Sequence, residues 1–104
     1  MAWFRRRRAR AAPDDERYRD DLAHLEQFAR SRRGVEAYLE PRTTVTESTV
    51  MLIAHDGEWT RRRVVNPQAA RVLADRLAIP LYDVGLLGYP QRMRDYNRRR
   101  QAGD

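Results

Sequence analysis

Histidine, the side chain that most often serves as a general acid or base and as a metal ligand, is sparse in this chain. There are two histidines, His24 and His55, and neither belongs to an H-x-H or H-x-x-x-H pair that could begin a metal site. His55, Asp56 and Glu58 cluster at an Asp-Gly turn, but we expect that turn to be exposed, whereas acid–base groups work in pockets that shift their pKa values. The sequence therefore predicts no catalytic residue and no metal ligand.

Motifs for covalent catalysis and for cofactor binding are also missing. The chain has no cysteine and all 21 of its basic residues are arginine, which excludes thiol nucleophiles, a P-loop lysine and a Schiff-base lysine. Neither Ser31 nor Ser48 lies in a G-x-S-x-G motif, and no G-x-G-x-x-G follows an expected strand. Residues 85–88 (Gly-Leu-Leu-Gly) match the G-x-x-G of KH domains, but the two leucines favour a plain turn. We expect no bound cofactor.

Arginine is the residue type best suited to bind a ligand, and it is concentrated at the two ends of the chain. The net charge is +6, yet residues 14–91 hold 11 arginines against 13 acids. Residues 1–13 hold five arginines and no acid, and residues 92–104 hold five arginines and two acids. Guanidinium groups bind phosphate through paired hydrogen bonds, and counterion release adds affinity without sequence preference. The pattern predicts a small non-enzymatic binding or adaptor protein that engages RNA or DNA. The ten predicted polyanion-binding residues are Arg5, Arg6, Arg7, Arg8, Arg10, Arg92, Arg94, Arg98, Arg99 and Arg100.

Trp59 is an aromatic residue inside a basic stretch. It lies close to Arg61 and Arg63 in the sequence, so it could stack on a base while the arginines contact phosphates. The alternative, which we favour, is that Trp59 packs in the core against Leu52 and Ala54.

An anionic membrane surface is the second hypothesis for a partner. Trp3 and Phe4 adjoin the run of arginines at 5–8, and this combination suits the headgroup region of a bilayer. No segment has the roughly 18 consecutive apolar residues of a membrane span, and no signal peptide is expected. Because the chain has no cysteine for disulfides, we expect a cytoplasmic protein, either free or peripheral at the inner face of the membrane.

Two other classes of function stay open. An enzyme would need a site that no motif reveals, such as Glu36, Glu40 and Glu47 meeting in a cleft. A protein-binding module would use a surface that the sequence does not mark, and the oligomeric state is not predicted.

Periodicity and capping residues predict the helices that would hold these groups. Residues 14–33 carry an apolar stripe at spacings of three and four, and Pro13 and Gly34 suit the two ends of that helix. Asn66 suits the N-cap of a second helix that reaches about residue 78. A final basic helix over about residues 90–100 would present the C-terminal arginines.

The strands are predicted from alternation and from apolar runs. Residues 35–40 alternate as a half-buried strand does, residues 49–55 are apolar on both faces as in a central strand, and residues 79–84 form a short last strand.

A hairpin is predicted at the Asp56-Gly57 turn. A two-residue type I′ turn there pairs Ala54 with Trp59 and Leu52 with Arg61. The run of three arginines at 61–63 would place charge on both faces of the second hairpin strand, which is typical of an edge strand.

These elements form one α+β domain in the order α-β-β-β-α-β-α, with a mostly antiparallel sheet and helices packed on it. We expect a basic N-terminal arm over residues 1–12, the domain over 13–97 and a basic C-terminal tail over 98–104.

Four segments also carry a family resemblance. Residues 33–37 (RGVEA), 45–47 (VTE), 56–63 (DGEWTRRR) and 88–97 (GYPQRMRDYN) resemble a family of short, uncharacterised actinobacterial proteins. The resemblance spans residues 33–99, roughly two-thirds of the chain, and rests most on the last motif. Some members are labelled oxidoreductases, so the resemblance implies redox activity, for which the sequence supplies no flavin or nicotinamide motif. It transfers no residue roles.

Overall fold

The computed structural model describes residues 13–41 and 47–103 of the chain. Its elements, in chain order, are α2 (Pro13–Ser31), β1 (Glu36–Glu40), β2 (Thr49–Ile53), β3 (Trp59–Arg63), α3 (Pro67–Leu77), β4 (Leu81–Asp83), α4 (Val84–Leu87) and α5 (Gln91–Gln101). The predicted α+β class and element order are confirmed. One element was not predicted, namely α4, which forms a single helical turn where the sequence favours a plain turn.

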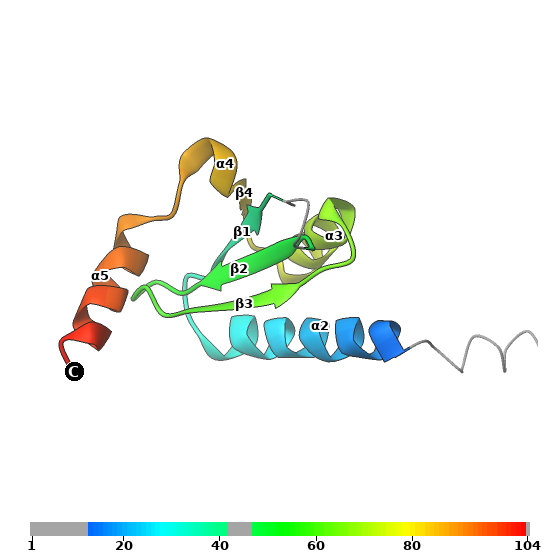
Figure 1. Cartoon of the computed structure of the whole chain (residues 1–104), viewed down its shortest axis with the longest axis horizontal. Helices are drawn as coiled ribbons and strands as arrows, with labels where there is room; N and C mark the ends of the chain where they lie inside the picture. Colours follow the sequence, from blue (N-terminus) through cyan, green and yellow to red (C-terminus); the bar gives the residue numbers. More distant parts are fainter. Residues whose placement is uncertain (1–12, 42–46, 104) are drawn as a thin grey trace, which may run out of the picture.

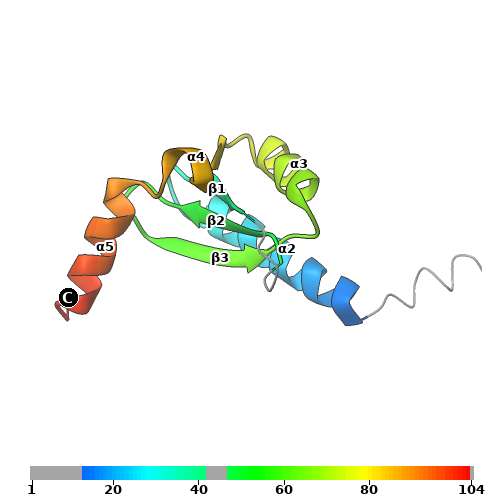
Figure 2. The same cartoon turned by 45° about the horizontal axis from the view of Figure 1, so that its top comes forward.

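The four strands form one mixed sheet in the order β3-β2-β1-β4. β2 pairs antiparallel with β1 and β3, whereas β4 pairs parallel with β1. A parallel pair requires a crossover connection, and α3 lies within it. The arginine-rich strand β3 is therefore an edge, as its charge predicts, and α5 lies at the end of the molecule opposite α3 (Figure 1; Figure 2).

The main core lies between the sheet and the layer formed by α2 and α3. Its buried residues are Leu25, Phe28, Val35, Ala37, Val50, Leu52, Ala54, Val64, Ala70 and Leu73. The start of α3 is fixed by a capping residue next to it in the sequence. The Asn66 side chain accepts a hydrogen bond from the backbone N–H of Ala69 at 2.9 Å, which confirms the predicted N-cap of α3. No helix in the described part of the chain is both long enough and apolar enough to cross a membrane.

A second, smaller core covers the opposite face of the sheet. Tyr38, Met51, Ile53 and Met93 are its buried members. The prediction of a half-buried first strand is wrong at Tyr38, which is only 6% exposed. The reason is tertiary, because Met93 of α5 and the segment before it cover the face that the sequence pattern assigns to solvent.

The hairpin differs from the prediction by one residue. Ile53 pairs with Trp59 and Leu52 with Thr60, not with Arg61. The connection has three residues, because the N–H of Ala54 bonds to the carbonyl of Glu58 at 2.8 Å and Gly57 adopts φ +95°. This is a turn followed by a left-handed glycine instead of a two-residue type I′ turn. A shift of one residue moves each side chain of β3 to the other face of the sheet.

Candidate polyanion-binding surface

The candidate surface is built on α5, which three side-chain contacts hold at one end of the sheet. Met93 is buried in the second core. The indole N–H of Trp59 on β3 donates to Oδ1 of Asn97 at 2.8 Å. The guanidinium of Arg92 reaches back over the sheet to Glu36 of β1. The helix is therefore a docked element and not a free tail.

Arg92 makes more hydrogen bonds to the rest of the fold than the other arginines of α5 do. Its Nη2 donates to Oε1 of Glu36 at 2.6 Å, and its Nε donates to the carbonyl of Ala54 at 3.0 Å. A further bond reaches the carbonyl of Ile53 at 3.3 Å, and the side chain is only 28% exposed. Of the five α5 arginines predicted to bind polyanion, this one has a structural role.

The remaining four arginines, at 94, 98, 99 and 100, are exposed along α5. Arg94 lies near Gln91 and Arg98 pairs with Asp95, the one acidic residue of the helix. Hydrogen bonding from Gln91 and the ion pair with Arg98 lower the pKa of Asp95. Arg98, Arg99 and Arg100 also occupy the last turn, where cations favourably oppose the helix dipole. Because α5 runs to Gln101, residues 98–101 of the expected tail are helical.

Aromatic rings lie beside these cations. The guanidinium carbons of Arg99 and Arg100 lie 5.9 and 5.8 Å from the centroid of the Tyr96 ring, and that of Arg61 lies 5.4 Å from the Trp59 ring. Arg99 also donates to the carbonyl of Asp56 in the hairpin loop at 3.0 Å. A shallow pocket of about 380 Å³ opens between Trp59, Tyr96, Asn97, Arg100 and Gln101.

Trp59 faces the side of the sheet opposite to the one predicted. Ala54 and Leu52 belong to the main core, whereas Trp59 packs partly buried against the second core. The one-residue shift of the hairpin explains the error. Sequence reasoning also missed Tyr96 and Asn97, although their spacing from Met93 on a helix, three and four residues, places all three toward one side.

The three carboxylates considered for an enzyme site do not share a cleft. Glu36 pairs with Arg92, Glu40 with Arg61 and Glu47 with Arg63. Burial raises the pKa of the Glu40 carboxyl, but hydrogen bonds from Arg61, Thr49 and Tyr89 outweigh that effect and bring the pKa below its ordinary value. All three carboxylates are therefore ion-pair partners of arginines. The lowered pKa of Glu40 is the opposite of what a general acid needs.

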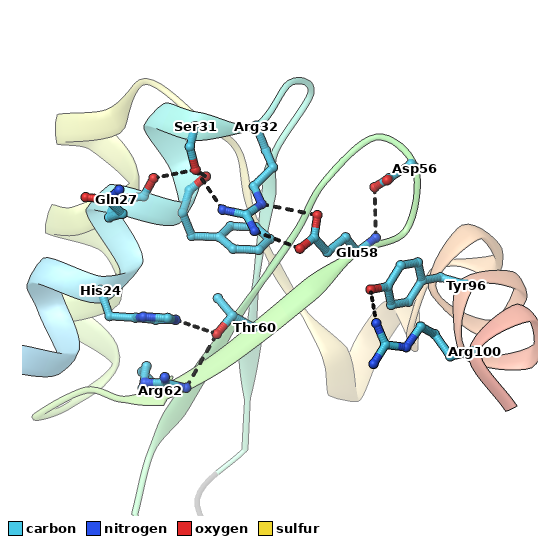
Figure 3. A network of polar contacts seen from close by, with 11 residues as sticks. His24, Gln27, Ser31, Arg32, Asp56, Glu58, Thr60, Arg62, Tyr96 and Arg100 are labelled. Atoms are coloured by element: carbon cyan, nitrogen blue, oxygen red, sulfur yellow. Dashed lines mark hydrogen bonds and ion pairs between the residues drawn. The ribbon is translucent and has the colours of Figure 1, made fainter. Parts of the chain in front are cut away.

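The histidines occupy two different environments. His24 of α2 lies against β3, with its Nε2 2.7 Å from the hydroxyl of Thr60, and Figure 3 shows Arg62 reaching the same hydroxyl. Burial lowers the pKa of His24, and the positive charge of Arg62 lowers it further. His55 is exposed in the hairpin loop. Within residues 13–41 and 47–103, no cluster of three histidine, aspartate or glutamate side chains could hold a metal.

Figure 3 also shows how α2 is fastened to the hairpin. Arg32 donates to both carboxylate oxygens of Glu58, at 3.2 and 2.7 Å, and its guanidinium lies 4.3 Å from the centroid of the Phe28 ring. The acidic cluster predicted at the turn thus serves the packing of α2, with Glu58 bound to Arg32 and Asp56 accepting from the backbone of Glu58.

The N-terminal candidates lie outside the described residues. These are Arg5, Arg6, Arg7, Arg8 and Arg10 for polyanion binding, and Trp3 and Phe4 for membrane contact. Their assignments stay predictions.

No family model, no curated protein and no solved structure matches this chain. The resemblance to the actinobacterial family therefore stays a prediction, and the functional argument rests on the geometry of α5.

Proposed function

We propose that this protein binds nucleic acid through the exposed arginines of α5, with residues 1–12 as a second basic segment. The observation that carries the proposal is the composition of the helix surface. Four exposed arginines share α5 with a single acidic residue, and two of the four lie over the ring of Tyr96. The expected binding is sequence-independent and driven by phosphate contacts.

The position of the helix supports this proposal. Arg92, Met93 and Asn97 fasten α5 to the sheet, so its arginines are held in place before a ligand arrives. Cations on a docked helix lose less backbone entropy on binding than cations on a free tail. Trp59 and Tyr96 at the edge of the pocket would add stacking on an unpaired base.

The test is a salt series with a short DNA duplex and the full chain. The variant Arg94→Gln/Arg98→Gln should bind more weakly, and the slope of log K against log salt should become shallower by about 1.8 if two phosphate contacts are lost. The matched control is Arg19→Gln/Arg71→Gln, which removes the same charge from exposed positions on α2 and α3.

Two results would contradict the proposal. Equal weakening by the two double variants would mean that net charge, and not α5, governs binding. Absence of duplex and single-strand binding by the wild-type chain near physiological salt would remove nucleic acid as the partner.

An anionic membrane is the second candidate, and one observation favours it. Leu86 and Leu87 of α4 are 85% and 65% exposed and directly precede the basic helix α5. Apolar side chains beside cations are the requirement for interfacial binding. On this reading, anionic vesicles bind the wild-type chain but not Leu86→Ser/Leu87→Ser, and Trp3→Ala/Phe4→Ala weakens the binding further. Duplex binding should be unaffected by either pair of changes.

A further inference from the structure

The pocket between α5 and the start of β3 combines three kinds of side chain. Its volume of about 380 Å³ lies within the roughly 300–1,000 Å³ of sites that bind small ligands. Two aromatic rings, two carboxamides and one guanidinium line it, from Trp59, Tyr96, Asn97, Arg100 and Gln101. Among the described residues, no acidic side chain contributes to the lining. This combination suits a ligand that is flat, polar and negatively charged, as a nucleotide is.

The fold holds both aromatic walls of the pocket in place. The indole N–H of Trp59 donates to Asn97 at 2.8 Å, which joins β3 to α5 across the pocket. On the other side, α5 approaches the hairpin loop so closely that a Cβ added at Gly57 would lie 2.8 Å from the Cβ of Tyr96. The walls are therefore positioned before any ligand binds.

The ring of Tyr96 and the charge of Arg100 remain accessible to a ligand. The guanidinium carbons of Arg99 and Arg100 lie 5.9 and 5.8 Å from the centroid of the ring, close to the limit of about 6 Å for a cation–π contact. Neither group therefore stacks closely on the ring. Arg100 takes part in no ion pair within the described residues, and its bond to the Tyr96 hydroxyl is long, at 3.5 Å (Figure 3). A phosphate can bind this guanidinium without displacing a carboxylate.

Asn97 supplies a group that fits the edge of a base. An indole N–H can only donate, so the atom of Asn97 that faces Trp59 is the amide oxygen. The NH2 group of the same amide keeps two donors, which form no hydrogen bond within the described residues. Carbonyl oxygens and ring nitrogens on the edges of bases accept from donors of this kind.

We propose that this pocket binds one unpaired base, so that the ligand of the α5 surface is single-stranded nucleic acid. The base stacks on Tyr96, its edge accepts from Asn97, and Arg100 binds the adjoining phosphate. A base inside a duplex is stacked on both faces and cannot enter the pocket without being flipped out. This inference rests on the proposed function, because the other exposed arginines of α5 supply the remaining phosphate contacts. None of the contacts involves the 2′-hydroxyl, so DNA and RNA strands should both bind.

The test compares three ligands of equal length with the full chain: a single strand, the same strand with abasic sugars in place of nucleosides, and a duplex. Tyr96→Leu should weaken binding of the ordinary single strand at least about fivefold, which is the lower end of what one stacked base contributes. Tyr96→Phe keeps the ring and should bind as the wild type does. Both variants should bind the abasic strand and the duplex as the wild type does, because the phosphate contacts remain.

The matched control is Tyr18→Leu. Tyr18 is also a half-buried tyrosine on a helix, and the guanidinium of Arg63 lies 5.2 Å from its ring centroid. The first half of α2, which carries Tyr18, lies at the end of the molecule opposite α5 (Figure 1). This control should bind the single strand as tightly as the wild type does.

Tryptophan fluorescence gives a second measurement that does not depend on a change at Tyr96. The chain has two tryptophans, so Trp59 is the sole reporter in the variant Trp3→Phe. The ordinary single strand should quench its fluorescence, whereas the abasic strand should not. Equal quenching by the two strands would contradict a base in the pocket.

The outcomes separate this inference from the proposed function. Equal affinity of the wild type for ordinary and abasic strands, or no greater loss in Tyr96→Leu than in Tyr18→Leu, would overturn the base pocket and leave binding through the arginines intact. An equal loss with all three ligands would assign Tyr96 to the support of α5 and would also overturn it. Unchanged binding by Arg94→Gln/Arg98→Gln, together with a loss in Tyr96→Leu, would contradict the role of those arginines and retain the pocket. Absence of binding to every ligand would overturn both.

Discussion

Replacing Arg92 by methionine should destabilise the fold, whereas the same change at Arg94 should not. The two residues have the same charge and lie on the same helix, but only Arg92 bonds to Glu36 and to the backbone of β2. Methionine keeps a stem of similar length and removes the guanidinium. The comparison therefore isolates the hydrogen bonds from the packing of the stem.

The magnitude follows from the contacts that are lost. The bond to the carbonyl of Ala54 contributes about 1 kcal/mol, as an ordinary hydrogen bond does. The ion pair with Glu36 is partly screened, because its side chains are 28% and 30% exposed, so it adds no more than about 1 kcal/mol. We expect a loss of about 2 kcal/mol for Arg92→Met, which lowers Tm by roughly 8 to 16 °C in a domain of this size.

The assay is urea unfolding followed by tryptophan fluorescence, with thermal unfolding as a second measure. Arg94→Met should stay within about 0.5 kcal/mol of the wild type, as exposed substitutions usually do. If both variants unfold at the same midpoint, Arg92 does not anchor α5, and its exclusion from the binding surface would lose its basis. Duplex binding gives the reverse expectation, because Arg94→Met should weaken it while leaving stability unchanged.

Two further changes test the packing on either side of the hairpin. Because burial and Arg62 lower the pKa of His24 from 6.5, the unfolded chain binds a proton that the folded chain does not, so the free energy of unfolding should fall as pH drops below about 6.5. His24→Gln should flatten this region of a pH series of urea titrations, and a wild-type curve without that decline would contradict the assignment. Gly57→Ala should lower the free energy of unfolding by more than the roughly 1–3 kcal/mol of backbone strain alone, since its Cβ would also lie 2.1 Å from the carbonyl oxygen of Arg92. Gly103→Ala, at φ +86° with no atom within 4 Å, is the control, and an equal loss of Tm there would show that backbone strain alone is responsible.

The helices on the main core were predictable because their signals are local. The apolar stripe of residues 14–33 predicts α2 to within two residues at its end, and Asn66 marks the start of α3. The edge position of β3 also follows from the sequence, since three consecutive arginines cannot all be buried in a central strand.

The composition of the candidate surface was likewise visible in the sequence. Five arginines within residues 92–100 on a predicted helix require no tertiary information to recognise. Tertiary information is needed, however, to decide which of these arginines are available for a ligand. Arg92 differs from the other four because it pairs with the carboxylate of Glu36 on β1. Nothing near Arg92 in the sequence reveals that contact.

Tertiary structure alone decided the hairpin register and the faces of the sheet. Asp56-Gly57 is compatible with a loop of two or three residues, since both lengths are common hairpin connections. The three-residue loop places Trp59, and not Thr60, on the face that α5 covers, where its indole meets Asn97. The choice depends on packing between segments almost forty residues apart, so no local pattern in the sequence could have specified it.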